Sequence, residues 1–283
     1  MFESGTVLAV NRESGDSWTY QMYTELEVGE FPLDMFGNVT YEFKAKDSLA
    51  MGLTETSVNI IGVEGELSGT AFVLGEPFVD AHAVMTGTQY ETETGVGTVK
   101  EDMHWLVNTS IGSDALSWLT QTDIQTVVVY DPAFMSEFDP KSIDKDLEWS
   151  ESIHINMTVY DWQNGTQTEV SNDRFIADFF FELDSTEDSI TTPAGTFETV
   201  VITVTAENGD RDVLWWSEEV DNFVKTVSYY AGEEEAYESM TLSSFEEGSQ
   251  GSTLLIIVAG VAFAVVATAV LVLVLIHKRP MKS

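Results

Sequence analysis

Apolar and polar residues alternate along much of this chain, which is the pattern of β-strands that bury one face. In residues 18–28 the even positions are mostly aromatic or aliphatic and the odd positions are mostly polar. The same alternation is present in residues 39–46 and 147–159. Apolar and β-branched runs predict further strands at residues 6–10, 58–63, 70–74, 98–107, 124–130, 175–183, 223–230 and 237–245. The chain is therefore predicted to be mainly β, with several strands longer than the usual length of about five or six residues.

Two local signals predict a turn and a helix. Asn208 and Gly209 separate two apolar runs within residues 200–216, and this dipeptide favours a type I′ hairpin turn because both residues tolerate positive φ. The acidic residues around it lack the spacing of a calcium-binding loop, so we prefer the turn interpretation. A short helix is predicted at residues 114–119, with Ser113 as its N-cap.

The alternation continues from residue 18 to residue 245 without a linker. Proline is scarce in this part of the chain, and Gly and Ser form no long tract. We therefore predict one extracytoplasmic domain, residues 1–245, built on a single curved antiparallel sheet that is half-barrel-like. The segment 131–145, with Pro132 and Pro140, is either a long loop of this domain or a boundary between two domains.

An uncharged apolar stretch begins at Leu254 and ends at Ile276. At about 1.5 Å per residue it forms a helix of ~35 Å, which is long enough to cross a hydrocarbon core of ~30 Å. A helix that is apolar on every face rarely finds a protein core to surround it at the end of a chain. We therefore predict a polar stalk at residues 246–252 and a single transmembrane helix at residues 253–276.

Charges on the two sides of this stretch predict its orientation. Glutamates precede it, whereas Lys278, Arg279 and Lys282 follow it. The positive-inside rule then makes residues 277–283 a basic cytoplasmic tail and leaves the N-terminal domain outside the cell. A tail-anchored protein with a cytosolic domain is the alternative topology.

The chain is strongly acidic, since 12 Lys and Arg stand against 48 Asp and Glu for a formal net charge of −36. Nucleic acids and anionic lipid headgroups are therefore disfavoured as partners. The simplest reason for such a charge is a surface exposed to a salty medium, as in a marine or halophilic microbe, where ions screen the repulsion between like charges.

Four sequons for N-glycosylation begin at Asn38, Asn108, Asn156 and Asn164, and they support an extracytoplasmic glycoprotein. The chain contains no cysteine, so neither disulfides nor thiolate chemistry is available to it. The hydrophobic core alone has to stabilise the fold, and a domain of this length is large enough for that.

Patterns typical of catalytic and metal sites are missing from the sequence. His82, His104 and His154 are far apart and lack the spacing of metal ligands or of a nucleophile and its base. Acidic residues are so numerous that pairs of carboxylates carry no information about a glycosidase. The acidic clusters in residues 139–148 and 182–188 leave weak calcium binding as an alternative to solvated loops. We predict that the protein is not an enzyme and has no cofactor or metal.

Three segments of the chain resemble one group of known families. They are residues 15–20 (GDSWTY), residues 192–199 (TPAGTFET), and Trp216 followed by Val220, Val224 and Lys225. In this order they resemble uncharacterised prokaryotic surface-protein families related to the lipoprotein-carrier (LolA/LppX-like) half-barrels. The resemblance implies a strongly curved antiparallel sheet around an apolar cavity. The carriers cover the mouth of that cavity with helices, whereas here only residues 113–120 offer a helix.

Aromatic residues are the candidates for contact with a ligand. Trp215 and Trp216 are adjacent, so on a strand they point to opposite faces and one of them faces away from the core. The candidate ligand-binding residues are Trp18, Tyr20, Phe179, Phe181, Trp215 and Trp216. The predicted function is a membrane-anchored extracytoplasmic binding module that holds a lipid or other apolar ligand on a curved sheet. The alternative is a structural or adhesive surface domain that has no small ligand and contacts another surface protein.

Overall fold

The computed structural model describes residues 14–28, 31–51, 54–73, 76–93, 97–111, 118–136, 138, 147–163, 165–220 and 222–246. Within these residues the chain forms twelve β-strands and no helix. The strands are β1 (Ser17–Val28), β2 (Phe31–Met51), β3 (Thr54–Val73), β4 (Glu76–Thr92), β5 (Thr98–Ile111), β6 (Trp118–Phe134), β7 (Glu148–Gln163), β8 (Thr166–Thr192), β9 (Gly195–Ala206), β10 (Arg211–Ser217), β11 (Asn222–Tyr229) and β12 (Ala236–Glu246).

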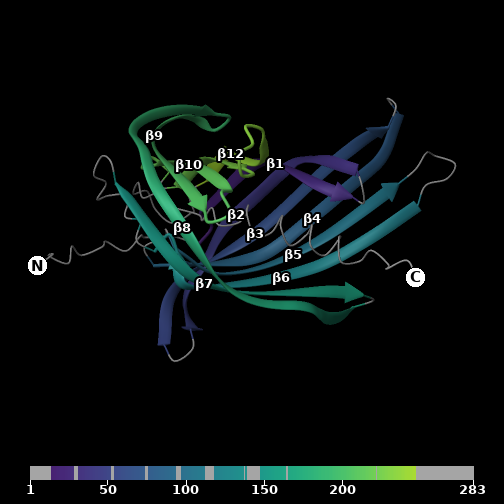
Figure 1. Cartoon of the computed structure of the whole chain (residues 1–283), viewed down its shortest axis with the longest axis horizontal. Coiled ribbons are helices and arrows are strands. Elements are labelled where there is room, and N and C mark those ends of the chain that lie inside the picture. The colour runs from purple at the N-terminus through teal and green to yellow at the C-terminus, as the bar shows by residue number, and fades with distance from the viewer. Residues whose placement is uncertain are drawn as a thin grey trace, which may run out of the picture.

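The described strands form one closed antiparallel barrel (Figure 1). Every strand pairs with the strands before and after it in the sequence, and the barrel closes because β1 also pairs with β12. The mainly β, antiparallel character is therefore confirmed. The half-barrel is wrong, because Ser17 to Thr24 of β1 are hydrogen-bonded to the last strand of the domain, and a half-barrel would leave both of these edges unpaired.

Hydrogen-bonded partners are strongly staggered around the barrel. When cross-strand partners are followed from Met22 of β1 through β12, β11, β10 and β9, they lead to Leu183 of β8. The N–H of Leu183 donates to the carbonyl of Leu147, just before β7. When the partners of Met22 are followed in the other direction, through β2, β3, β4 and β5, they lead to Thr122 of β6. Thr122 lies close to the residue of β6 that pairs with Asp161, near the far end of β7. Such a stagger makes the strands tilt as the barrel closes. Figure 1 accordingly shows the short strands β9–β12 grouped near one end of the long strands β2–β7.

Strand β8 connects the two groups and has a different partner in each half. All of it up to Glu182 pairs with β7, whereas β9 pairs only from Phe179 onward. Among the described residues, the part before Phe179 therefore has a neighbour on one side only. Its side chains are largely exposed, with Ile176 at 57%. The barrel is thus closed around the second half of β8 and open along the first half.

Most strand predictions are confirmed, and the strands are longer than predicted. The predicted strands at 58–63 and 70–74 belong to a single strand, β3, because Glu64 to Gly69 continue the pairing with β4. Strand β4 itself has no counterpart among the predicted strands. Its inward residues include Ala81, Ala83 and Gln89, so its alternation in hydrophobicity is weak.

The hairpin between β9 and β10 is confirmed, but its turn type is not I′. Gly209 has φ +91°, whereas Asn208 is not among the described residues with positive φ. The N–H of Gly209 donates to the carbonyl of Ala206 (2.8 Å), and the N–H of Ala206 donates to the carbonyl of Asp210 (2.9 Å). This is the three-residue loop in which a type I turn is followed by a left-handed glycine. Asn208 instead stabilises the turn by accepting a hydrogen bond from the N–H of Asp210 (3.1 Å).

Several predicted elements lie outside the described residues. They are the strand at 6–10, most of the helix at 114–119, most of the segment 131–145, most of the stalk at 246–252, the transmembrane helix at 253–276 and the tail at 277–283. The last two residues of the predicted short helix, Trp118 and Leu119, are described and belong to β6, so the helix prediction is wrong there; Leu119 is 83% exposed. No helix that is long and apolar enough to cross a membrane is found in the described part of the chain.

Candidate ligand-binding inner face

Every second side chain of each strand points into the barrel, and we call these side chains the inner face. Strand β4 shows the arrangement: its inward positions from Val79 to Glu91 are buried except for Gly87, whereas the outward Asp80 and Thr86 are exposed. A pleated strand produces this alternation because successive side chains point to opposite sides. Along β4 the inner face changes from apolar to polar, in the order Val79, Ala81, Ala83, Met85, Gly87, Gln89, Glu91.

The apolar part of the inner face contains methionines that lie across glycines of a neighbouring strand. A Cβ atom at Gly65 would lie 3.1 Å from Cε of Met85, and one at Gly69 would lie 2.8 Å from Sδ of Met35. Met103 covers Gly87 in the same way. A methionine can adopt this flat arrangement because its unbranched side chain has three rotatable bonds. We call this group the methionine wall; it comprises Met35, Met85 and Met103 with Gly65, Gly69 and Gly87.

The polar part of the inner face is centred on Glu101 of β5. Glu101 is the cross-strand partner of Gln89 on β4, and both are buried, with exposures of 3% and 0%. The hydroxyl of Tyr130 donates to Oε2 of Glu101 (3.2 Å), and Nε2 of Gln89 donates to Oγ1 of Thr98 (3.1 Å). Glu91, two positions after Gln89, is the next inward residue of β4 and is also buried.

Tyr41 of β2 connects these residues with an acid from the other side of the barrel. Burial raises the pKa of the Tyr41 hydroxyl, and the charges of Glu101, Glu238 and Glu91 raise it further. The three acids therefore lie within electrostatic reach of one hydroxyl. The hydroxyl of Thr24 on β1 donates to Oε2 of Glu238 on β12 (3.1 Å). We call this group the carboxylate belt; it comprises Gln89, Glu91, Glu101 and Glu238 with Tyr41 and Tyr130.

Burial makes the carboxylates of the inner face hard to ionise. It raises the pKa of Glu101 to about 8; the hydrogen bond from Tyr130 opposes this shift and the charge of Glu91 adds to it. Burial likewise raises the pKa of Asp212 on β10 to about 7, with the hydrogen bond to Ser228 opposing and Asp210 adding. The buried charged residues of the described chain are all acidic, with no Lys, Arg or His among them. The buried charges of the inner face are therefore acidic in the described residues.

The comparisons with known proteins give no relative for this chain. Searches against protein-family models, curated proteins and solved structures found no match. The resemblance to the lipoprotein carriers therefore stays a prediction.

Three of the six predicted ligand-binding aromatics lie together. Trp18 and Tyr20 are inward residues of β1, and Trp216 is an inward residue of β10. The hydroxyl of Tyr20 donates to the carbonyl of Phe223 (3.1 Å), and Phe223 is the cross-strand partner of Trp216. Tyr20 also meets the ring of Tyr41 edge to face, with centroids 5.7 Å apart, so this group adjoins the carboxylate belt.

Phe179 and Phe181 belong to a second aromatic group on the far side of the barrel from β1. Both contact Phe134, with ring centroids 5.0 and 5.8 Å apart, and Phe181 stacks on Trp149 at 4.6 Å. Phe181 is fully buried and Phe179 is half-buried. These contacts make Phe181 a packed core residue, and they place Phe179 where the paired and unpaired halves of β8 meet.

Trp215 faces away from the inner face, as the alternation with Trp216 requires. Its indole N–H donates to Oδ2 of Asp188 (3.3 Å), and Nζ of Lys225 lies 5.1 Å from its ring centroid. Neighbouring strands thus already provide polar partners for this outward tryptophan, which leaves it half-buried.

The sequons differ in accessibility. Asn38 and Asn108 are exposed on β2 and β5. Asn156 is half-buried, and its side-chain oxygen is shielded from solvent. Asn164 lies outside the described residues.

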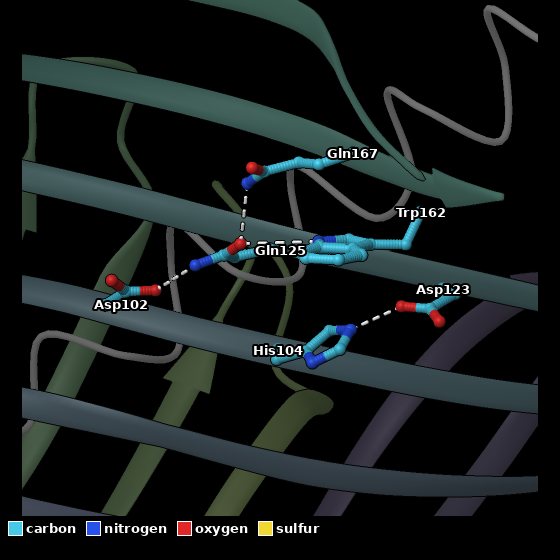
Figure 2. A network of polar contacts seen from close by, with 6 residues as sticks. All are labelled: Asp102, His104, Asp123, Gln125, Trp162 and Gln167. Atoms are coloured by element: carbon cyan, nitrogen blue, oxygen red, sulfur yellow. Dashed lines mark hydrogen bonds and ion pairs between the residues drawn. The ribbon is translucent and has the colours of Figure 1, made fainter. Parts of the chain in front are cut away.

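A polar network lies on the outer surface of the barrel and connects β5, β6, β7 and β8 (Figure 2). Gln125 is at its centre. Its Nε2 donates to Oδ1 of Asp102 (2.6 Å), and its Oε1 accepts hydrogen bonds from Nε1 of Trp162 (3.3 Å) and Nε2 of Gln167 (2.9 Å). These groups satisfy one another, so the network holds neighbouring strands together on the outer face.

The histidines also lie on outward positions. His104 pairs with Asp123 beside the network, as Figure 2 shows, and Nε2 of His82 lies 2.6 Å from Oε1 of Glu66. His154 is exposed on β7. Among the described residues, His and acidic side chains form no cluster of three or more that would suit a metal ion.

Sequence reasoning found the aromatic groups and missed the carboxylate belt. The sequence does contain a signal for Glu101. This acid is separated by an even number of positions from the apolar Met103 and Val107, so on a strand it lies on the same, inward face. The signal was hidden on β4, because a strand has to be recognised before its inward positions can be assigned.

Proposed function

We propose that this chain is a membrane-anchored extracytoplasmic binding protein whose barrel encloses a lipid or another apolar ligand. The observation that carries the proposal is the closure of twelve strands around an inner face that is largely apolar. A barrel of about eight strands is just wide enough for its own side chains to fill, and the diameter grows with strand number. A barrel of twelve strands is wider than one of eight, which supports room for a ligand inside it.

The anchor in this proposal is the apolar segment 253–276, and the charge of the flanking residues supports an N-terminal domain outside the cell. Exposed sequons at Asn38 and Asn108 agree with that location. A barrel attached to a membrane surface is close to a supply of lipid. The apolar inner face and the apolar anchor thus support one function.

The structural or adhesive surface domain is the second candidate, and the unpaired half of β8 favours it. Val170, Phe175 and Ile176 are exposed there, beside a backbone edge that lacks a second neighbour among the described residues. Exposed apolar strand edges are typical sites for contact with another chain.

Photolabelling of the full chain in vesicles separates the two candidates. A fatty alcohol with a diazirine on its chain partitions into the bilayer and labels any protein segment that it contacts. We expect labelled peptides from β4 and β5 in addition to peptides from residues 253–276, which act as an internal reference. Label confined to residues 253–276 would contradict the proposal and leave the structural or adhesive function.

A matched pair of variants tests whether the labelled position is the inner face. Ala83→Trp fills an inward position of β4, and Thr86→Trp adds the same side chain at an exposed position of the same strand. We expect Ala83→Trp to lower the labelling of β4 and β5 severalfold and Thr86→Trp to leave it unchanged, with circular dichroism confirming that both variants fold. Equal labelling in the two variants would place the lipid on the outer surface.

A further inference from the structure

Two buried oxygen atoms of the carboxylate belt lack a hydrogen-bond donor among the described residues. Oε1 of Glu101 and Oε1 of Gln89 have no hydrogen-bond partner among the described residues, although the two residues are direct cross-strand partners on the inner face. Gln89 uses its donor group on Thr98, so the oxygen of its amide is the free end. A buried acceptor without a donor is costly, and native proteins rarely keep two of them side by side.

The buried charged residues near these acceptors are all acidic. Glu91 and Glu238 lie within electrostatic reach of the same Tyr41 hydroxyl as Glu101, and the buried charged residues of the described chain include no base. A ligand that completes this group has to bring both positive charge and hydrogen-bond donors. A primary ammonium group brings one positive charge and three N–H donors in a compact head.

We propose that the carboxylate belt binds the protonated amine of an amphiphile, with Oε1 of Glu101 and Oε1 of Gln89 accepting its N–H groups. This inference rests on the proposed function and specifies its ligand: an apolar chain that ends in a primary amine. The methionine wall adjoins the belt on the same strands, because Met85 and Gly87 precede Gln89 on β4 and Met103 follows Glu101 on β5. A ligand whose head lies at Glu101 therefore has the methionine wall beside its chain.

The protonation of Glu101 gives this binding a pH dependence. Tyr130 and Gln89 face Glu101 from the neighbouring strands, and Glu91 adds the nearest negative charge, so the pKa of Glu101 is raised to about 8. An ammonium group beside the carboxylate favours its charged form. The preference for an amine is thus expected to increase from pH 6 to pH 9, while an amine of ordinary pKa, about 10, stays protonated.

Competition against the photolabel measures this preference on the full chain in vesicles. Dodecylamine and dodecan-1-ol have the same chain and differ in the head, and each is titrated against the labelling of β4 and β5. We expect dodecylamine to halve the labelling at a concentration at least ~10-fold lower than dodecan-1-ol, a difference that corresponds to about one well-made charged hydrogen-bond pair. In Glu101→Gln the two potencies should become equal.

The control is Glu64→Gln, which removes the same charge from an exposed position of β3 and should keep the full preference for the amine. Equal potencies in the unmodified chain would overturn the inference and mean that water satisfies the two acceptors, while the proposed function would still stand. A preference for the amine that survives in Glu101→Gln would also overturn it, because the selectivity would then come from the bilayer or from the outer surface. Failure of both compounds to compete would instead contradict the proposed function itself.

Discussion

The methionine wall and the carboxylate belt share strands β2, β4 and β5 and lie on the same inner face, and they differ in almost every other respect. The wall follows the ordinary rule of burial, since apolar side chains leave water and small residues let the strands approach one another. The belt breaks this rule, because Glu101 and Gln89 are as buried as the methionines and yet keep acceptors without donors. The wall stabilises the barrel, whereas the belt costs stability. Such a local conflict in an otherwise consistent fold is typical of a functional site.

The largest expected effect concerns two inward glycines, Gly65 of the wall and Gly37 on the neighbouring strand β2. A Cβ atom at Gly37 would overlap the carbonyl oxygen of Glu66, which belongs to the backbone of the neighbouring strand, whereas one at Gly65 would meet Cγ2 of Val39 at 3.0 Å and Cε of Met85 at 3.1 Å. Gly37→Ala should therefore lower the free energy of unfolding by about 3 kcal/mol, because a backbone has to move. Gly65→Ala should cost less than about 1 kcal/mol, because the ends of two side chains can move aside.

Urea unfolding of the two variants measures the difference. Equal losses of stability in the two variants would mean that the strands are not in close contact at Gly37. Gly37, covered by backbone, and Gly65, covered by side chains, would then not differ in their tolerance of a Cβ atom.

An intermediate effect is expected from pH, and it should arise mainly from Glu101 of the belt. The folded pKa of Glu101, about 8, lies above its ordinary value of 4.5, so between these values the folded state holds a proton that the unfolded state has released. The stability contributed by the neutral carboxyl is then fully present below pH 4.5 and is lost as the pH rises through about 8. Between pH 6 and pH 8 the free energy of unfolding should fall by on the order of 1 to 2 kcal/mol.

Glu101→Gln should flatten this slope, since a glutamine does not titrate. Asp212, whose pKa is raised to about 7, contributes a smaller slope of the same sign and should keep it in the variant. Chemical unfolding at a series of pH values provides the measurement, and an unchanged slope in Glu101→Gln would show that the carboxyl is solvated.

The smallest effect is expected from salt, which acts on the outer surface and leaves both parts of the inner face unaffected. The net charge of −36 repels itself across the surface, so the thermal midpoint should rise as salt is added from near zero, by an amount equivalent to about 1 kcal/mol or less per group of neighbouring charges. Salt should leave the pH slope of Glu101 intact, because ions screen buried charges much less than exposed ones. A midpoint that does not change between low and molar salt would argue against the screening.

Strands whose inward residues are large and apolar could be predicted from the sequence. Strand β1 has Trp18, Tyr20 and Met22 on one face and Thr19 and Gln21 on the other, and its alternation identified it at once. Strand β4 lacks this contrast, because its inward residues end in Gln89 and Glu91 while Val84 and Tyr90 point outward. The polar inward residues of β4 therefore made this strand hard to predict.

Closure of the barrel and the belt could not be predicted, for two different reasons. Pairing of β1 with β12 joins residues at opposite ends of the domain, and local alternation carries no information about which edges meet. The acids of the belt are three among 48, and only its inward position distinguishes Glu101 from an exposed acid such as Glu64. Position within the sheet, rather than residue type, defines the candidate site.

The two halves of β8 have a consequence for how the backbone exchanges hydrogen with water. From Phe179 to Glu182 the strand pairs with β7 on one side and with β9 on the other, so successive N–H groups are directed at one strand or the other; beyond this stretch β9 is the paired strand. In the first half every second N–H is directed at β7, and the N–H groups between them are directed away from it, where no described strand receives them. Amide protection along Thr166 to Asp178 should accordingly alternate residue by residue, so that this one strand records in solution where the barrel is open and where it closes.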